Sequence, residues 1–184
     1  MKRVLFLALV LLLIAFIGFN SFNHKAVPLA SHAIIGKVVS CSKITVANGV
    51  SKGILLPCLD GKTRVLYQSI RGPVVVNVFG SWCEPCNQEI PHFLDLQALH
   101  KVAIVGIDVE ERNMLAGRNF VIKKGMTWPI LYDPNSVTRG IFGLGVPVTW
   151  FINAGGKVVY KQIGLITSTS ELTSEVSKYL KVKL

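Results

Sequence analysis

The sequence predicts an α/β fold, a mixed β-sheet flanked by helices, with an N-terminal transmembrane or signal helix. Three observations lead to this prediction. Apolar runs typical of strands alternate with helical patterns between residues 74 and 142, as expected for parallel strands connected by helices. Two further apolar runs, 148–152 and 158–163, flank a turn at Ala154-Gly155-Gly156 and predict an antiparallel hairpin. A long hydrophobic segment follows the first three residues.

The N-terminal segment begins with Met1-Lys2-Arg3 and continues with apolar residues from Val4 to Phe19. This run exceeds the ~7–15 residues of a signal core and approaches the ~20 needed to span a bilayer. Ser31-His32-Ala33 could serve as a cleavage site but lies far downstream. We therefore expect residues 1–23 to form an uncleaved membrane anchor, in preference to a cleaved signal. The basic start should stay in the cytoplasm, which places the rest on the extracytoplasmic side of the cell membrane.

The length of 184 residues suits one domain with an accessory segment. We expect residues 24–52 to form a linker and N-terminal extension, and residues 53–184 to form the domain. The net charge is +10, yet the basic residues are scattered and no run is longer than Lys123-Lys124. This distribution predicts a basic surface near a membrane and no nucleic-acid site.

The remaining elements can be placed in order along the chain. Asp60-Gly61 predicts a hairpin turn between residues 53–56 and 63–66. The expected strands are Val74–Phe79, Val102–Asp108, Ile130–Leu131, Val148–Ile152 and Val158–Ile163. The expected helices are Cys83–Leu99 with a kink at Pro91, Asn113–Lys124, Ser136–Phe142, and a last helix capped by Thr169 or Ser170.

The segment Gly80-Ser81-Trp82-Cys83-Glu84-Pro85-Cys86 lies between the first buried strand and the first helix of the domain. A Cys-x-x-Cys at this place indicates a dithiol/disulfide redox pair. Residues i and i+3 share a helix face, with Cβ atoms roughly 5–6 Å apart, so a small adjustment permits a disulfide. The positive helix start favours a thiolate at Cys83, which we expect to be the exposed nucleophile. Cys86 is then the resolving thiol.

Half of a zinc site is the alternative interpretation of the two cysteines. Structural zinc needs four ligands, and the sequence has no second Cys-x-x-Cys, while His92 and His100 lack the usual ligand spacing. Asn87 stands where a haem attachment site requires histidine. We therefore favour a redox pair, and expect no metal and no cofactor.

Two further cysteines, Cys41 and Cys58, lie outside the motif. In an exported chain such cysteines are expected to pair. We predict a Cys41–Cys58 structural disulfide that ties the N-terminal extension to the domain. Two buried free thiols are the main alternative. A relay that exchanges with the Cys83–Cys86 pair is less favoured, because neither residue lies in a motif that would activate it.

Several motifs resemble those of the thioredoxin superfamily. Trp82-Cys83-Glu84-Pro85-Cys86 resembles the active site, Pro91 matches the proline that kinks the first helix, and Gly145-Val146-Pro147-Val148-Thr149 resembles the cis-proline loop. The run from Cys86 to Pro91, with glutamate three residues after the cysteine, is similar to the TlpA/ResA-like branch. Members of that branch are membrane-anchored, extracytoplasmic proteins, and several serve cytochrome c maturation. The resemblance covers about residues 53–181 and implies a thioredoxin-like fold.

The resemblance also implies a substrate-binding surface. Val146-Pro147 should be joined by a cis peptide bond that presents the backbone of Val146 to an extended substrate peptide. Trp82 should pack beside the cysteine pair; the alternative is an ordinary core aromatic.

Glu89 lies one turn beyond Cys86. Its spacing alone would favour a solvated helix residue, whereas the resemblance assigns it to the active site. A carboxyl at this position could accept the proton of Cys86 or tune both thiol pKa values. Asn77 occupies the strand position at which cytoplasmic thioredoxins have a buried aspartate, which leaves Glu89 as the expected proton acceptor.

These features predict an enzyme, a thiol–disulfide oxidoreductase that acts on thiols and disulfides of exported proteins. Electrons would come from a membrane dithiol donor, and the pair is expected to be held mostly reduced. By resemblance, the favoured substrate is apocytochrome c, reduced before haem attachment. The same chemistry run backwards, as an oxidase of exported proteins, is the alternative. A thiol metallochaperone that delivers copper or zinc is an alternative from a different class.

Overall fold

The computed structural model describes residues 35–143 and 145–184. The expected anchor, residues 1–23, and the first part of the expected linker lie outside the described residues. Every helix within the two described ranges is too short or too polar to cross a membrane.

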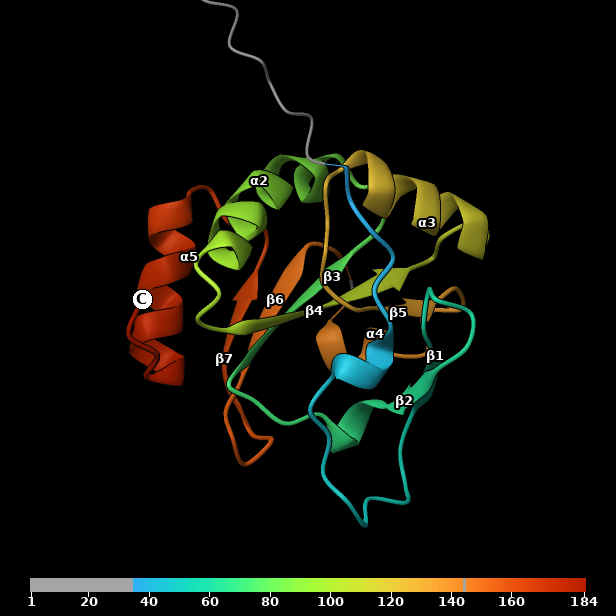
Figure 1. The fold of residues 1–184 in the computed structure, drawn as a ribbon, viewed down its shortest axis with the longest axis horizontal. Coiled ribbons are helices and arrows are strands. Elements are labelled where there is room, and N and C mark those ends of the chain that lie inside the picture. The colour runs from blue at the N-terminus through green and yellow to red at the C-terminus, as the bar shows by residue number, and fades with distance from the viewer. Residues whose placement is uncertain (1–34, 144) are drawn as a thin grey trace, which may run out of the picture. The chain divides into compact units, whose positions relative to one another are not determined.

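A five-stranded mixed sheet forms the centre of the domain, with strand order β5-β4-β3-β6-β7 (Figure 1). β3 pairs in parallel with β4, and β4 with β5, whereas β6 is antiparallel to both β3 and β7. All residues of β3 are buried, as expected for an apolar strand covered on both faces. The expected mixed sheet is thereby confirmed. The strands are β3 (Val74–Phe79), β4 (Ala103–Val109), β5 (Ile130–Asp133), β6 (Val148–Ile152) and β7 (Val158–Ile163).

Helices cover both faces of this sheet, with more helix on one face than on the other. α2, α3 and α5 pack on one face, where Phe93, Phe120 and Leu172 join a single apolar cluster. On the opposite face α4 places Phe142 in a second cluster, with Trp150 of β6. The helices are α2 (Glu84–Ala98), α3 (Met114–Lys123), α4 (Arg139–Phe142) and α5 (Thr169–Glu175), which continues as the π-helical turn η3 (Val176–Leu180).

The start of α5 corrects one expectation. Ser168, not Thr169 or Ser170, is the N-cap, and its hydroxyl accepts a hydrogen bond from the Glu171 N–H at 3.1 Å. Ser168 has extended backbone angles, which an N-cap requires, and it stands three residues before a glutamate, as in a capping box.

The predicted N-terminal hairpin is present as β1 (Leu55–Pro57) and β2 (Arg64–Leu66). In the connecting loop, the Asp60 carboxylate accepts backbone hydrogen bonds from Lys62 at 2.7 Å and Thr63 at 2.9 Å. Partial burial opposes ionisation, yet these bonds hold the pKa of Asp60 well below its usual range. Gly61 has φ +74°, a conformation that side chains with a Cβ rarely adopt.

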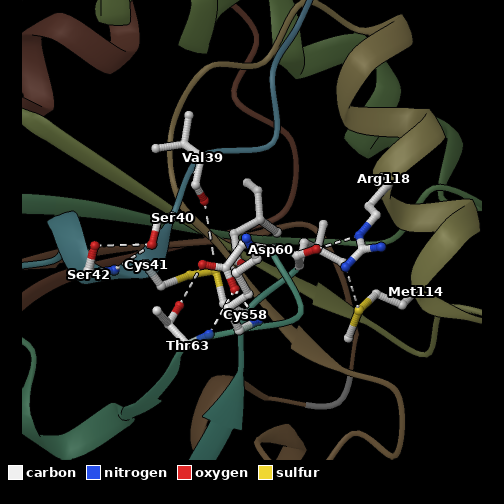
Figure 2. Close-up of a disulfide and its surroundings, with 12 residues drawn as sticks. Val39, Ser40, Cys41, Ser42, Cys58, Asp60, Thr63, Met114 and Arg118 are labelled. Carbon is white, nitrogen blue, oxygen red and sulfur yellow. Dashed lines mark hydrogen bonds between the residues drawn. A yellow bond between two sulfur atoms is a disulfide. The ribbon is translucent and has the colours of Figure 1, made fainter.

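The predicted Cys41–Cys58 disulfide is confirmed, with a Cα–Cα distance of 5.9 Å (Figure 2). It joins the 3-10 turn η1 (Cys41–Lys43) to the end of β1, and both cysteines are buried. Bridges from Val39 to Pro129 and from Cys58 to Leu131 lie along the outer edge of β5. The disulfide therefore links two segments that cover a sheet edge, which would otherwise expose unpaired backbone groups.

Candidate functional site

The two cysteines of the motif lie at the start of α2, directly after the carboxyl end of β3. Cys83 is the N-cap residue of α2, and Cys86 lies in its first turn; a disulfide joins them. The Cys83 Sγ also accepts a hydrogen bond from the Cys86 N–H at 3.2 Å. In the reduced form, this N–H and the positive helix start can both stabilise a thiolate at Cys83. Pro85 lies in the first turn, where its missing N–H costs little.

Cys83 was expected to be exposed, but its side chain is almost completely buried. Cys83 is 4% exposed and Cys86 is 0% exposed, because both pack into the apolar cluster between the sheet and α2. The order of access is nevertheless as expected, since the small accessible area belongs to Cys83.

Glu89 is fully buried below the pair, which excludes a solvated helix residue. Its carboxylate accepts hydrogen bonds from the Asn77 side-chain amide at 2.7 Å and from the Ile166 N–H at 3.2 Å. Burial raises the pKa of Glu89 to about 7, although the bonds from Ile166 and Asn77 oppose the rise. Residues i and i+3 of a helix are neighbours, so this carboxyl lies on the face of α2 that carries Cys86.

Sequence reasoning missed the role of Asn77 as the direct partner of Glu89. Asn77 is opposite Thr149 in the β3–β6 ladder, and both residues are 0% exposed. The Asn77 Oδ1 and the Thr149 Oγ1 have no hydrogen-bond partner among the described residues. The sequence signal was a pair of polar residues, each within an apolar strand. Together with Glu89 they form a buried polar cluster.

The Val146–Pro147 bond is cis, as predicted. The carbonyl of Pro147 accepts a hydrogen bond from the Gly164 N–H at 3.0 Å, which ties this loop to the end of β7. Trp82 is 56% exposed, so it is not a core aromatic. Its indole N–H donates to the carbonyl of Val109 at 3.3 Å, and its ring lies against Gly80, where a Cβ would approach the ring nitrogen to 2.5 Å.

A small, mainly apolar cavity of about 70 Å³ separates the active-site loop from the cis-proline loop. Trp82 and Val146 form part of its wall, and Val109 and Phe142 contribute further apolar surface. An ion pair between Glu110 and Arg139 also lines it. The sequence did not indicate this cavity, because its walls come from three stretches that are distant in the sequence, 78–82, 109–110 and 136–146.

A second buried acid lies behind the active-site loop. Asp108 is opposite Phe79 in the β3–β4 ladder, is 0% exposed, and neither carboxyl oxygen has a partner among the described residues. Burial, together with the charge of Glu111, raises the pKa of Asp108 to about 8. Glu111 itself accepts a hydrogen bond from the N–H of Ser81 at 3.3 Å. The aspartate within an apolar strand was the available sequence signal.

No group of three or more His, Cys, Asp or Glu side chains in residues 35–143 and 145–184 is arranged to hold a metal ion. His92 contacts the Thr169 hydroxyl at 3.1 Å instead.

Comparisons with known proteins identify similar chains. A model described as the AhpC/TSA family matches residues 52–161. The thiol-disulfide oxidoreductase ResA of Bacillus thuringiensis (strain Al Hakam) is 31% identical over 128 residues, covering 67% of this chain and 70% of the relative. The ResA of Bacillus subtilis (strain 168) is 28% identical over 176 residues, covering 91% and 89%. Among solved structures, dsbF of MTB has a TM-score of 0.60 and 26% identity, covering 68% of this chain and 94% of that chain.

Proposed function

Because this chain belongs to the AhpC/TSA family and is, like its ResA relatives, a thiol-disulfide oxidoreductase with a thioredoxin-like fold, we propose that it reduces disulfides of exported proteins outside the cytoplasm. Apocytochrome c is the favoured substrate. The observation that carries the proposal is the cysteine pair at the start of α2 with a buried carboxyl one turn further along.

The first step uses the reduced enzyme. The Cys83 thiolate attacks one sulfur of the substrate disulfide, forms a new S–S bond to it and breaks the original one. The other substrate sulfur leaves as a thiolate and takes up a proton. The Cys86 N–H, 3.2 Å from the Cys83 Sγ in the disulfide form, supports the attacking thiolate.

The second step resolves the mixed disulfide. Glu89 takes the proton of the Cys86 thiol, and the resulting thiolate attacks the Cys83 Sγ. The second substrate sulfur then leaves as a thiolate and takes up the proton that Glu89 releases, and the enzyme holds the Cys83–Cys86 disulfide. Two electrons and two protons have reached the substrate, and a membrane dithiol donor supplies the electrons that reduce the enzyme again. A pKa of about 7 suits Glu89 to this transfer near neutral pH.

Substrate binding is assigned to Trp82, Val146 and Pro147. An extended peptide would lie along the cis-proline loop, with an apolar side chain beside its cysteine entering the cavity of about 70 Å³. The exposed face of Trp82 would cover the bound sulfur. Glu110 and Arg139 would contact polar groups at the border of this cavity.

The proposed location rests on the hydrophobic N-terminal segment. Residues 1–23 would anchor the chain in the membrane by an uncleaved helix, with the catalytic domain on the extracytoplasmic side. The structural disulfide between Cys41 and Cys58 supports this location, since such bonds persist in oxidising compartments.

The test is to trap the substrate. A Cys86→Ser variant cannot resolve the mixed disulfide, so it should accumulate one with apocytochrome c in cells, while Cys83→Ser, the matched control, should trap nothing. The purified wild-type protein, once reduced, should also reduce a Cys-x-x-Cys-His peptide disulfide.

Acid quenching of cells, followed by alkylation of free thiols, should find the Cys83–Cys86 pair predominantly reduced. A pair found oxidised while the membrane electron donor is intact would support the oxidase alternative instead.

A further inference from the structure

A pocket of about 500 Å³, lined by both polar and apolar residues, lies where β3, β4 and β5 begin, at the end of the sheet opposite to the active-site cysteines. Its lining includes the basic side chains Lys43, Arg71 and Lys101, with His100 beside them, and it includes no Asp or Glu. Lys43, His100 and Lys101 are exposed. The guanidinium of Arg71 is partly occupied, because it donates to the carbonyls of Gln68 and Ile70 at 3.0 and 2.9 Å.

The basic character extends beyond the pocket. Backbone hydrogen bonds join residue 36 to Ile122 of α3, residue 37 to Met126 just beyond that helix, and residue 72 to residue 153. The segments that meet here, 35–45, 71–74, 97–103, 122–129 and 153–157, contain no acidic residue. We call their Lys and Arg residues the basic end: Lys37, Lys43, Arg71, Lys101, Lys123, Lys124 and Lys157. The fold therefore gathers charges that look scattered in the sequence, while Glu84, Asp108, Glu110 and Glu111 lie near the active-site loop.

The described chain enters the domain at this same end. Ile35 is 76% exposed, and the next residue, Gly36, donates its N–H to the carbonyl of Ile122 in α3. If the anchor ends at residue 23, eleven residues, 24–34, connect it to Ile35. A chain of that length spans at most ~40 Å when fully extended. An anchor that ends at residue 23 would therefore hold Ile35 within ~40 Å of the bilayer surface.

We propose that the basic end binds the headgroups of anionic phospholipids, so that the active-site end is directed away from the bilayer. This inference rests on the membrane anchoring in the proposed function. Clustered Lys and Arg residues next to a membrane segment are attracted to anionic lipid. The pocket that Lys43 and Lys101 help to line has a volume of about 500 Å³, which is enough for a phosphate group. Because these side chains are exposed, added salt weakens the attraction.

The experiment uses the full chain reconstituted in nanodiscs of phosphatidylcholine, with or without phosphatidylglycerol. Hydrogen–deuterium exchange should show protection of peptides covering residues 97–103 and 122–129 only with the anionic lipid, and the protection should disappear in high salt. Each basic side chain near an anionic surface contributes about a fivefold change in occupancy. A Lys43→Glu, Lys101→Glu variant should therefore lose the protection. The matched control, Lys62→Glu with Arg112→Glu, has the same charge change at the other end of the domain and should retain it.

The outcomes separate this proposal from the one on which it rests. Retention in the nanodisc without lipid-dependent protection at either peptide would refute the membrane contact and leave the anchor intact. A chain that does not co-purify with nanodiscs would overturn both. Equal protection by inorganic phosphate in neutral nanodiscs would assign the pocket to a free anion and refute the membrane contact. Lipid-dependent protection that persists in the Lys43→Glu, Lys101→Glu variant would also refute the membrane contact.

Discussion

Replacing Glu89 by glutamine tests the buried acid directly, because glutamine keeps the size of the side chain and one oxygen acceptor. Burial raises the pKa of Glu89 from 4.5 to about 7, against the opposing hydrogen bonds from Ile166 and Asn77. At about 1.36 kcal/mol for each pH unit, this difference corresponds to about 3 kcal/mol of stability. Because glutamine does not titrate, Glu89→Gln should remove the part of the pH dependence of the unfolding free energy that comes from Glu89.

The sign follows from the number of protons bound in each state. Between pH 4.5 and about 7 the folded protein keeps a proton on Glu89 that the unfolded chain has lost. The stabilisation is therefore fully present below pH 4.5 and is lost as the pH rises through about 7. Urea unfolding of the oxidised chain, followed by tryptophan fluorescence, should show the variant gaining about 3 kcal/mol relative to wild type between pH 4 and pH 8.

A kinetic measurement separates catalysis from stability. The release of a model substrate from the mixed disulfide on Cys83 should accelerate in wild type as the pH rises through about 7, because Glu89 must be ionised to accept the Cys86 proton. In Glu89→Gln the release should accelerate at a higher pH, at which the Cys86 thiol loses its proton without help from Glu89. The control is Glu84→Gln, because Glu84 carries an exposed carboxyl on the same helix. Identical pH profiles for wild type and Glu89→Gln, in both stability and release, would refute the reasoning.

Three further predictions follow from the other buried groups. Asp108→Asn should become more stable than wild type as the pH rises through about 8, because the raised pKa of Asp108 makes its ionisation destabilising; thermal unfolding at pH 6 and pH 9 measures this, and an unchanged difference would contradict it. A Cys41→Ser, Cys58→Ser variant should lose about 3 kcal/mol for a loop of 17 residues but keep its exchange activity, as urea unfolding and a disulfide reduction assay would show. Alkylation of the reduced protein should modify Cys83 first, with an apparent pKa below ~8.5; faster labelling of Cys86 would reverse their roles.

The elements that the sequence predicted well are those with strong local signals. The apolar run of β3 and the turn between β6 and β7 gave the strand bounds without error. The predicted strand ended at Leu131 because Asp133-Pro134 is typical of a turn, whereas β5 continues to Asp133. Asp133 is instead buried and accepts hydrogen bonds from Val137 and Thr138, so its polar character is satisfied inside the fold.

The candidate site was predictable where its residues are close in sequence and unpredictable where the chain brings distant segments together. The cysteine pair and the cis bond before Pro147 carry their own motifs. The bond between Asn77 and Glu89 joins β3 to α2, and no spacing rule indicates it. The cavity wall and the basic end likewise combine segments from separate parts of the sequence.

The burial of Glu89 also affects how strongly the cysteine pair acts as a reductant. A carboxylate near the pair disfavours the thiolate of the reduced form, and a less stable thiolate makes the pair more reducing. Glu89 exerts this effect only when ionised, and its pKa of about 7 divides the physiological range. Below that pH the acid is neutral, and the Cys86 N–H and the helix start act on the Cys83 thiolate without opposition from Glu89. The same carboxyl that accepts a proton during resolution therefore makes the pair more reducing as the pH rises through about 7.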